Sequence, residues 1–173
     1  STSEPVAWGW DLGRKVDYTV GIGLDKRGCE ARMVRFQKPW PETIRDIRRE
    51  TGKAPALVDQ SGLGDPVFQQ IQRPRLGTAQ IAGEQDREIR YNRPAGNFEG
   101  FLFTGPSKQQ LVEDLVIAVQ SQHVRFTEGV IAEEMRCFEY LYTRTGVRYS
   151  APEGSHDDAV MALALAWRRF QAR

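Results

Sequence analysis

Three aspartates in three different settings are the residues of this chain best suited to carry chemistry. Asp11 lies in the segment Gly-Trp-Asp-Leu-Gly of residues 9–13, and Asp59 ends the apolar run Ala-Leu-Val-Asp. Asp157 and Asp158 open an alanine-rich segment that continues to Ala166. Oxygen ligands of this kind hold Mg²⁺, and a site with two such ions cuts phosphodiesters. The aspartates therefore make a shared hard-metal site the first hypothesis.

Each aspartate also has a simpler explanation that involves no ligand. Asp11 could end a strand at a turn, and Asp59 could form an Asx turn. One of Asp157 and Asp158 could simply complement a helix dipole. The small residues after them would let that helix pack closely against a sheet and push its first carboxylate towards Asp11 and Asp59. Asp158 is the preferred ligand and Asp157 a second ligand or neighbour, whereas His156 is better explained as an exposed turn residue.

Hydrophobic periodicity predicts the elements that must position these acids. A first strand followed by a meander, a helix, and then a short buried strand ending at Asp59 is the expected order, with helices dominating afterwards. This order predicts an α/β fold, a mixed sheet flanked by helices. The expected strands are 6–12, 17–25, 29–36, 55–59, 78–82, 124–126 and 142–149. The expected helices are 42–51, 65–72, one that starts at Pro106 and includes Val119, 128–140 and 156–171. Residues 83–100 are expected to form an exposed loop or β-hairpin.

Length and composition are those of one globular domain spanning residues 1–173. The chain has 173 residues, of which 40% are hydrophobic and 27% charged, and its formal net charge is +1. No apolar run approaches the roughly 20 residues that a membrane span needs. Cys29 and Cys137 have no paired spacing, which argues against a zinc site and favours a reducing compartment.

The segments around the aspartates, taken together, resemble the RNase H-like superfamily and, within it, the nuclease domain of phage large terminase subunits. The resemblance covers nearly the whole chain. It is carried by residues 9–13 and 17–21, by Val-Asp-Gln-Ser-Gly-Leu-Gly-Asp-Pro-Val at 58–67, by Phe-Thr-Gly-Pro-Ser-Lys-Gln at 103–109, and by 142–146 with His-Asp-Asp-Ala-Val-Met-Ala-Leu-Ala at 156–164.

The resemblance implies that Asp11, Asp59, Asp158 and Asp157 are catalytic metal ligands for two Mg²⁺ or Mn²⁺ ions. It implies cutting of double-stranded concatemeric DNA during viral genome packaging, in the cytoplasm of an infected bacterium. The implied partners are a packaging ATPase domain, a small terminase subunit and a portal, with no membrane. The ATPase is expected to be absent from residues 1–173, because no G-x-x-x-x-G-K-[ST] motif is present.

Basic residues near the acids are the expected source of DNA affinity, because phosphate contacts dominate binding. The best candidate is Lys108, which begins a helix where free amides could also meet phosphate. The other candidates are Arg14, Lys15, Arg87, Arg90 and Arg93. Two alternatives to a terminase-type nuclease stay open: a junction resolvase or RNase H on the same scaffold, and a non-catalytic binding module.

Overall fold

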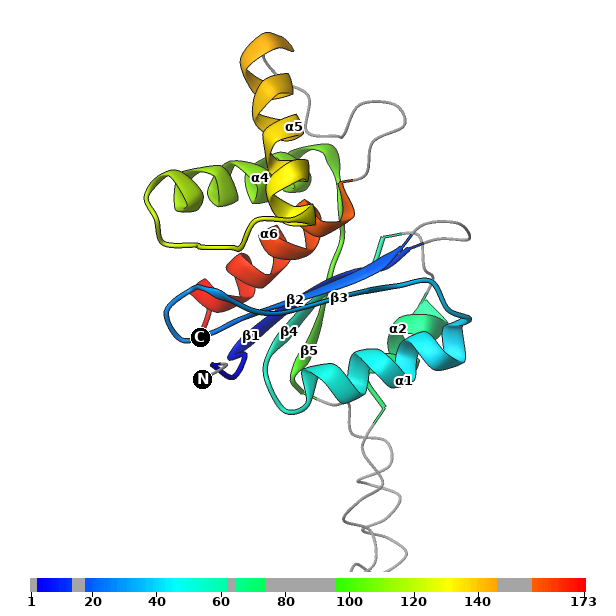
Figure 1. Cartoon of the computed structure of the whole chain (residues 1–173). Coiled ribbons are helices and arrows are strands. Elements are labelled where there is room, and N and C mark those ends of the chain that lie inside the picture. Colours follow the sequence, from blue (N-terminus) through cyan, green and yellow to red (C-terminus); the bar gives the residue numbers. More distant parts are fainter. Residues whose placement is uncertain (1–2, 14–17, 62–64, 74–95, 146–156) are drawn as a thin grey trace, which may run out of the picture.

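A five-stranded mixed sheet with helices on both faces forms the centre of the chain (Figure 1). The computed structural model describes residues 3–13, 18–61, 65–73, 96–145 and 157–173. The strand order is β3-β2-β1-β4-β5. The elements are β1 (Ala7–Asp11), β2 (Thr19–Leu24), β3 (Glu30–Phe36), α1 (Trp40–Thr51), β4 (Ala56–Asp59), α2 (Asp65–Ile71), β5 (Phe98–Phe101), α4 (Gly105–Gln120), α5 (Val130–Thr145) and α6 (Asp158–Gln171).

The sheet combines an antiparallel meander with two parallel pairings. β1 pairs antiparallel with β2, and β2 with β3, whereas β4 runs parallel to β1 and β5 parallel to β4. The turn from β2 to β3 is closed by Asp25, whose Oδ1 accepts the amides of Arg27 and Cys29 at 2.8 and 3.0 Å. Because β1 and β4 are parallel neighbours, their carboxyl ends lie at the same end of the sheet, where Asp11 and Asp59 stand.

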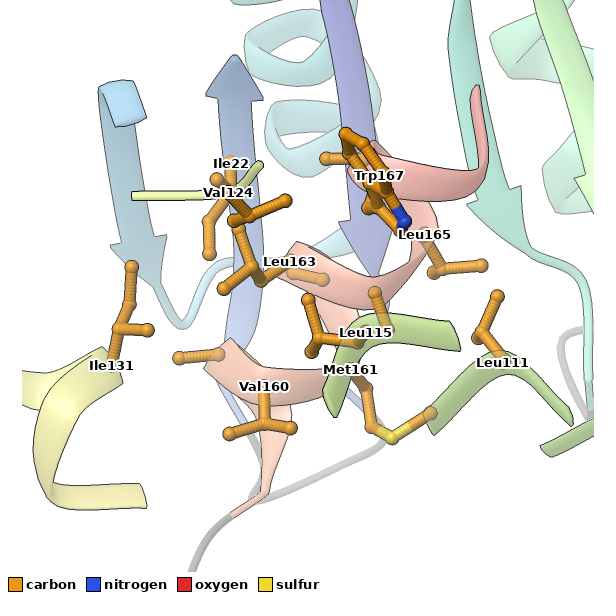
Figure 2. Packing of buried hydrophobic residues seen from close by; sticks show 14 of the residues in the cluster. Ile22, Leu111, Leu115, Val124, Ile131, Val160, Met161, Leu163, Leu165 and Trp167 are labelled. Atoms are coloured by element: carbon orange, nitrogen blue, oxygen red, sulfur yellow. The ribbon is translucent and has the colours of Figure 1, made fainter. Parts of the chain in front are cut away.

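Two hydrophobic clusters cover the two faces of the sheet. The first joins β2 and Leu57 of β4 to α4, α5 and α6. Figure 2 shows part of it, with Ile22 of β2, Ile131 of α5 and Leu163 of α6 among the labelled side chains. The second joins Trp8, Trp10 and Val58 to Ile47 of α1 and to α2. Trp8 and Trp10 stack with their ring centroids 5.4 Å apart and are almost fully buried, so the expectation that they pack in the core rather than against bases is confirmed.

The helix α6 is the main contact of the sheet on the face that carries the acids. Its residues from Ala159 to Trp167 are all buried. It packs against β1, β2 and β4, and against α4 and α5 (Figure 1). Nearly continuous burial explains why this segment is apolar on every side, as a helix enclosed by protein must be.

The structure corrects the sequence-based elements in the second half of the chain. The exposed loop or β-hairpin expected at 83–100 ends in a strand of the main sheet, because residues 98–101 are β5 and pair with β4. The expected strand at 142–149 is wrong at its start, since α5 continues to Thr145. A helix already begun gains one hydrogen bond per added residue, which outweighs the β propensity of Tyr and Thr. Of 124–126, only Arg125 forms a bridge, to Cys29. The strand expected at 78–82 lies outside the described residues.

Candidate active site

The parallel pairing of β1 and β4 sets the positions of Asp11 and Asp59. Trp10 pairs with Val58, and each aspartate is the next residue along its strand. Side chains alternate across a strand, so Asp11 shares a face with Gly9 and Asp59 with Leu57. Leu57 belongs to the cluster beneath α6, and Gly9 lies directly against α6. Both carboxylates therefore point to the face on which α6 packs.

The start of α6 brings a second pair of acids to this place. Asp158 is the first residue of α6, and Asp157 is its N-cap. The side chain of Asp157 makes no capping hydrogen bond, although aspartate usually does so at this position. Its carboxylate instead contacts a lysine of a different helix, as described below. A capping hydrogen bond therefore does not account for this acid.

The electrostatics of Asp11 indicate that the other three aspartates lie near it. Burial raises the pKa of Asp11 well above its usual range, and the charges of Asp59, Asp158 and Asp157 raise it further. A hydrogen bond with the side chain of Asp158 acts in the same direction. Two carboxyl groups share a hydrogen bond only when one of them carries a proton. The site thus holds more negative charge than its surroundings balance.

Asp59 is 7% exposed and helps to order the segment after β4. Its Oδ1 accepts the amide of Ser61 at 2.7 Å, which is the Asx-type turn considered as its simpler explanation. The Ser61 hydroxyl in turn accepts the amide of Phe103 at 2.6 Å. Asp59 can therefore form this turn and also belong to the acid cluster. Through Ser61, the turn connects the end of β4 to the segment that leads into α4.

Lys108 is the one predicted DNA-binding residue that the described structure places at the acids. A capping box between Thr104 and Ser107 fixes the start of α4. One turn in, the Nζ atom of Lys108 lies 3.5 Å from Oδ2 of Asp157. Lys108 is only partly exposed, with 30% of its side chain accessible. Arg14, Lys15, Arg87, Arg90, Arg93 and His156 lie outside the described residues.

Glu134 of α5 is a neighbour of the cluster that the sequence-based reasoning missed. It is 8% exposed, and its Oε2 accepts the backbone amide of Val160 at 3.0 Å. Burial and the charges of Asp158 and Asp157 raise the pKa of Glu134 to about 7, although hydrogen bonds from the amides of Val160 and Ala159 oppose this rise. The signal was present in the sequence, because Glu134 follows Ile131 by three residues and so falls on the apolar face of its helix.

The donor set suits a hard divalent cation, which prefers several carboxylate oxygens. In the part of the chain that the structure describes, no three or more His, Cys, Asp or Glu side chains are already drawn together into a metal-holding group. Burial and the neighbouring aspartates nevertheless raise the pKa of Asp11, and a bound cation would relieve that cost of ionising it. None of the described helices is long and apolar enough to span a bilayer.

Comparison with known proteins identifies relatives over nearly the full chain. No protein-family model matches the sequence. The large terminase subunits of Thermus phage G20c and Thermus virus P23-45 are each 23% identical over 172 residues, or 95% of this chain. This chain spans 32% of the length of each relative.

Solved structures of the phage G20c large terminase nuclease have the same fold. The structure with bound magnesium superposes with a TM-score of 0.72 at 24% identity, and the one with bound cobalt with a TM-score of 0.70 at 25% identity. Each comparison covers 94% of this chain and 80% of the other. By sequence and by structure, the chain is homologous to the nuclease domain of a phage large terminase over nearly its whole length.

Proposed function

We propose that the chain is a metal-dependent endonuclease that hydrolyses phosphodiesters of double-stranded DNA. The observation that supports the proposal is the position of Asp11, Asp59, Asp158 and Asp157 near one end of the sheet, where burial and the charges of the other three raise the pKa of Asp11. The relatives support it, because the G20c large terminase nuclease has been solved with magnesium, zinc and cobalt.

Asp11, Asp59 and Asp158, with Asp157, would hold two Mg²⁺ or Mn²⁺ ions. Two such ions supply activation of an attacking water and stabilisation of the departing oxygen. The carboxylates come from β1, β4 and α6, which pack against one another, and this packing would help to position them. Asp157 also holds Lys108 beside the site, where its ammonium would attract a DNA phosphate.

The same proposal extends to the biological setting of the relatives. Their large terminase subunits are about three times as long as this chain. We infer that the nuclease works beside a packaging ATPase domain, a small terminase subunit and a portal. It would cut concatemeric viral DNA in the cytoplasm of an infected bacterial cell.

Cleavage by the wild-type chain and the Asp59→Asn variant tests the proposal. With Mg²⁺ or Mn²⁺, the wild type is expected to cut linear duplex DNA, and Asp59→Asn is expected to lose this activity while keeping its fold and much of its DNA affinity. Asp59 sits at a strand end, where its amide analogue can still accept the Ser61 amide. Wild-type cleavage by a purified Asp59→Asn protein would refute the proposed role of this residue.

A panel of substrates separates the remaining enzymatic alternatives. Linear duplex, a four-way junction and an RNA–DNA hybrid are compared under identical conditions. Preferential cutting of the junction would indicate a resolvase, and cutting of the hybrid an RNase H. A chain that binds DNA with no metal-dependent cleavage of any of the three would be a binding module.

A further inference from the structure

A row of three residues across the sheet connects the acid cluster to the edge strand β3. Asp11 pairs with Val20 of β2, and Val20 pairs with Arg35 of β3. Directly opposed residues on neighbouring strands project to the same face, and Val20 belongs to the cluster beneath α6. Arg35 therefore lies on the same face and at the same end of the sheet as Asp11. Two strand spacings place their backbones about 10 Å apart.

Arg35 is held in place by an aromatic ring. Its guanidinium carbon lies 4.0 Å from the ring centroid of Tyr18, and Tyr18 packs against the cluster that contains Val20. A guanidinium stacked on a ring loses little further freedom when it binds a ligand, and the donors along its edge stay available. Tyr18 thus orients an exposed cation beside the acid site.

Arg35 forms no ion pair with any carboxylate of the described residues. Arg32, three residues earlier on the other face of β3, differs in this respect. Its guanidinium donates two hydrogen bonds of 3.0 Å to the carboxylate of Glu50. The strand therefore carries two exposed arginines, of which Arg32 is paired with a carboxylate and Arg35 has an aromatic ring as its partner.

We propose that Arg35, supported by Tyr18, binds a backbone phosphate of DNA on the β3 side of the acid cluster. This inference rests on the proposed function for the identity of the ligand. With a backbone separation of about 10 Å from Asp11, Arg35 would meet a phosphate near, but not at, the bond that is cut. Lys108 approaches the acids from α4, which follows β5 at the opposite edge. The two cations would support one DNA strand on either side of the cut.

Equilibrium binding across a salt series tests this assignment. A fluorescein-labelled duplex of about 25 base pairs is titrated in EDTA with the wild type, Arg35→Ala, Arg35→Lys and Arg32→Ala, each first checked for folding by thermal melting. We expect Arg35→Ala to weaken binding about 5- to 10-fold and to reduce the slope of log K against log salt by about 0.9, the loss for one phosphate contact. Arg35→Lys should keep the slope and recover part of the affinity. Arg32→Ala should bind as the wild type does.

Wild-type affinity and an unchanged salt slope in Arg35→Ala would overturn the assignment. An equal loss of DNA affinity in Arg32→Ala would also overturn it, because it would mean that only overall charge matters. A wild-type chain with no DNA affinity would overturn it as well. The binding readout is independent of cleavage. A chain that binds through Arg35 but never cuts would refute the nuclease proposal alone, and a chain that cuts while Arg35→Ala binds normally would refute this inference alone.

Discussion

Gly9 in the middle of β1 lies directly against the carbonyl oxygen of Ala162 in α6, with no room between them for a methyl group. A Cβ atom at Gly9 would overlap that oxygen and also the backbone nitrogen of Ala166. The obstructing atoms belong to helical backbone, which cannot turn aside as a flexible side chain could. Gly9 is two residues from Asp11, and α6 begins with Asp158, so this contact sets the distance between two acids of the site.

Gly9→Ala is expected to destabilise the protein and to impair cleavage. Forcing α6 away from β1 should cost about 2 kcal/mol or more, as overpacking of a close-packed interior does. That cost lowers the melting temperature by about 4–8 °C in a domain of this size. The measurement is thermal unfolding together with cleavage of linear duplex at a temperature where the variant is folded.

Gly96→Ala is the matched control for this change, because a Cβ atom at Gly96 meets nothing within 4 Å. It adds the same methyl group in open space and should melt as the wild type does. Equal melting temperatures for the two variants would show that α6 does not rest on Gly9 as closely as described.

The first half of the fold was predictable because its signals are local. The meander of β1, β2 and β3, the helix α1 and the buried strand β4 follow from alternation, turn residues and helix ends that each lie within a few positions. β5 was missed because residues 98–101, Phe-Glu-Gly-Phe, carry no strand pattern distinct from the polar stretch before them. Their pairing with β4 is non-local, and it is this partner that makes the segment a strand.

The aspartates of the site and the elements that carry them were predictable from the sequence, but the residues that contact them were not. Asp11, Asp59 and Asp158 stood out because carboxylates end or begin apolar elements. The contact of Lys108 with Asp157 joins residues 49 apart, and that of Glu134 with Val160 joins residues 26 apart. Such contacts depend on how α4 and α5 pack around α6, which no local pattern specifies. The same holds for the row that leads from Asp11 to Arg35.

Glu134 should make stability depend on pH in a way that Glu134→Gln removes. The pKa of Glu134 is raised to about 7 in the folded protein from a model value of 4.5, so the folded state binds more protons than the unfolded state between these values. The free energy of unfolding therefore falls as pH rises from 4.5 to 7, by up to about 3 kcal/mol. Melting in EDTA at pH 5 and pH 8 should show a smaller difference for Glu134→Gln than for the wild type.

Glu133→Gln provides the control, because Glu133 is the exposed neighbour on the same helix and its substitution removes the same charge. Its pH dependence should match that of the wild type. The pKa of Asp11 is also raised, so Asp11 makes the free energy of unfolding fall with rising pH in all three proteins. Its contribution therefore cancels when their pH dependences are compared. Parallel curves for Glu134→Gln and the wild type would contradict the assigned origin of the effect.

Asp11→Asn should abolish cleavage yet stabilise the metal-free protein. The substitution removes a carboxyl group whose pKa is raised by burial and by the charges of Asp59, Asp158 and Asp157. We expect a gain of about 1 kcal/mol, or about 2–4 °C in melting temperature. Saturating Mn²⁺ should then stabilise the wild type further, by about 2.7 kcal/mol at one hundred times the dissociation constant, and should leave Asp11→Asn nearly unchanged.

Glu42→Gln is the control, because it alters an exposed acid in the first turn of α1. It should respond to Mn²⁺ as the wild type does. If Asp11→Asn melts below the wild type in EDTA, or gains as much from Mn²⁺, the four carboxylates are not the mutually repelling set that a cation would bring together.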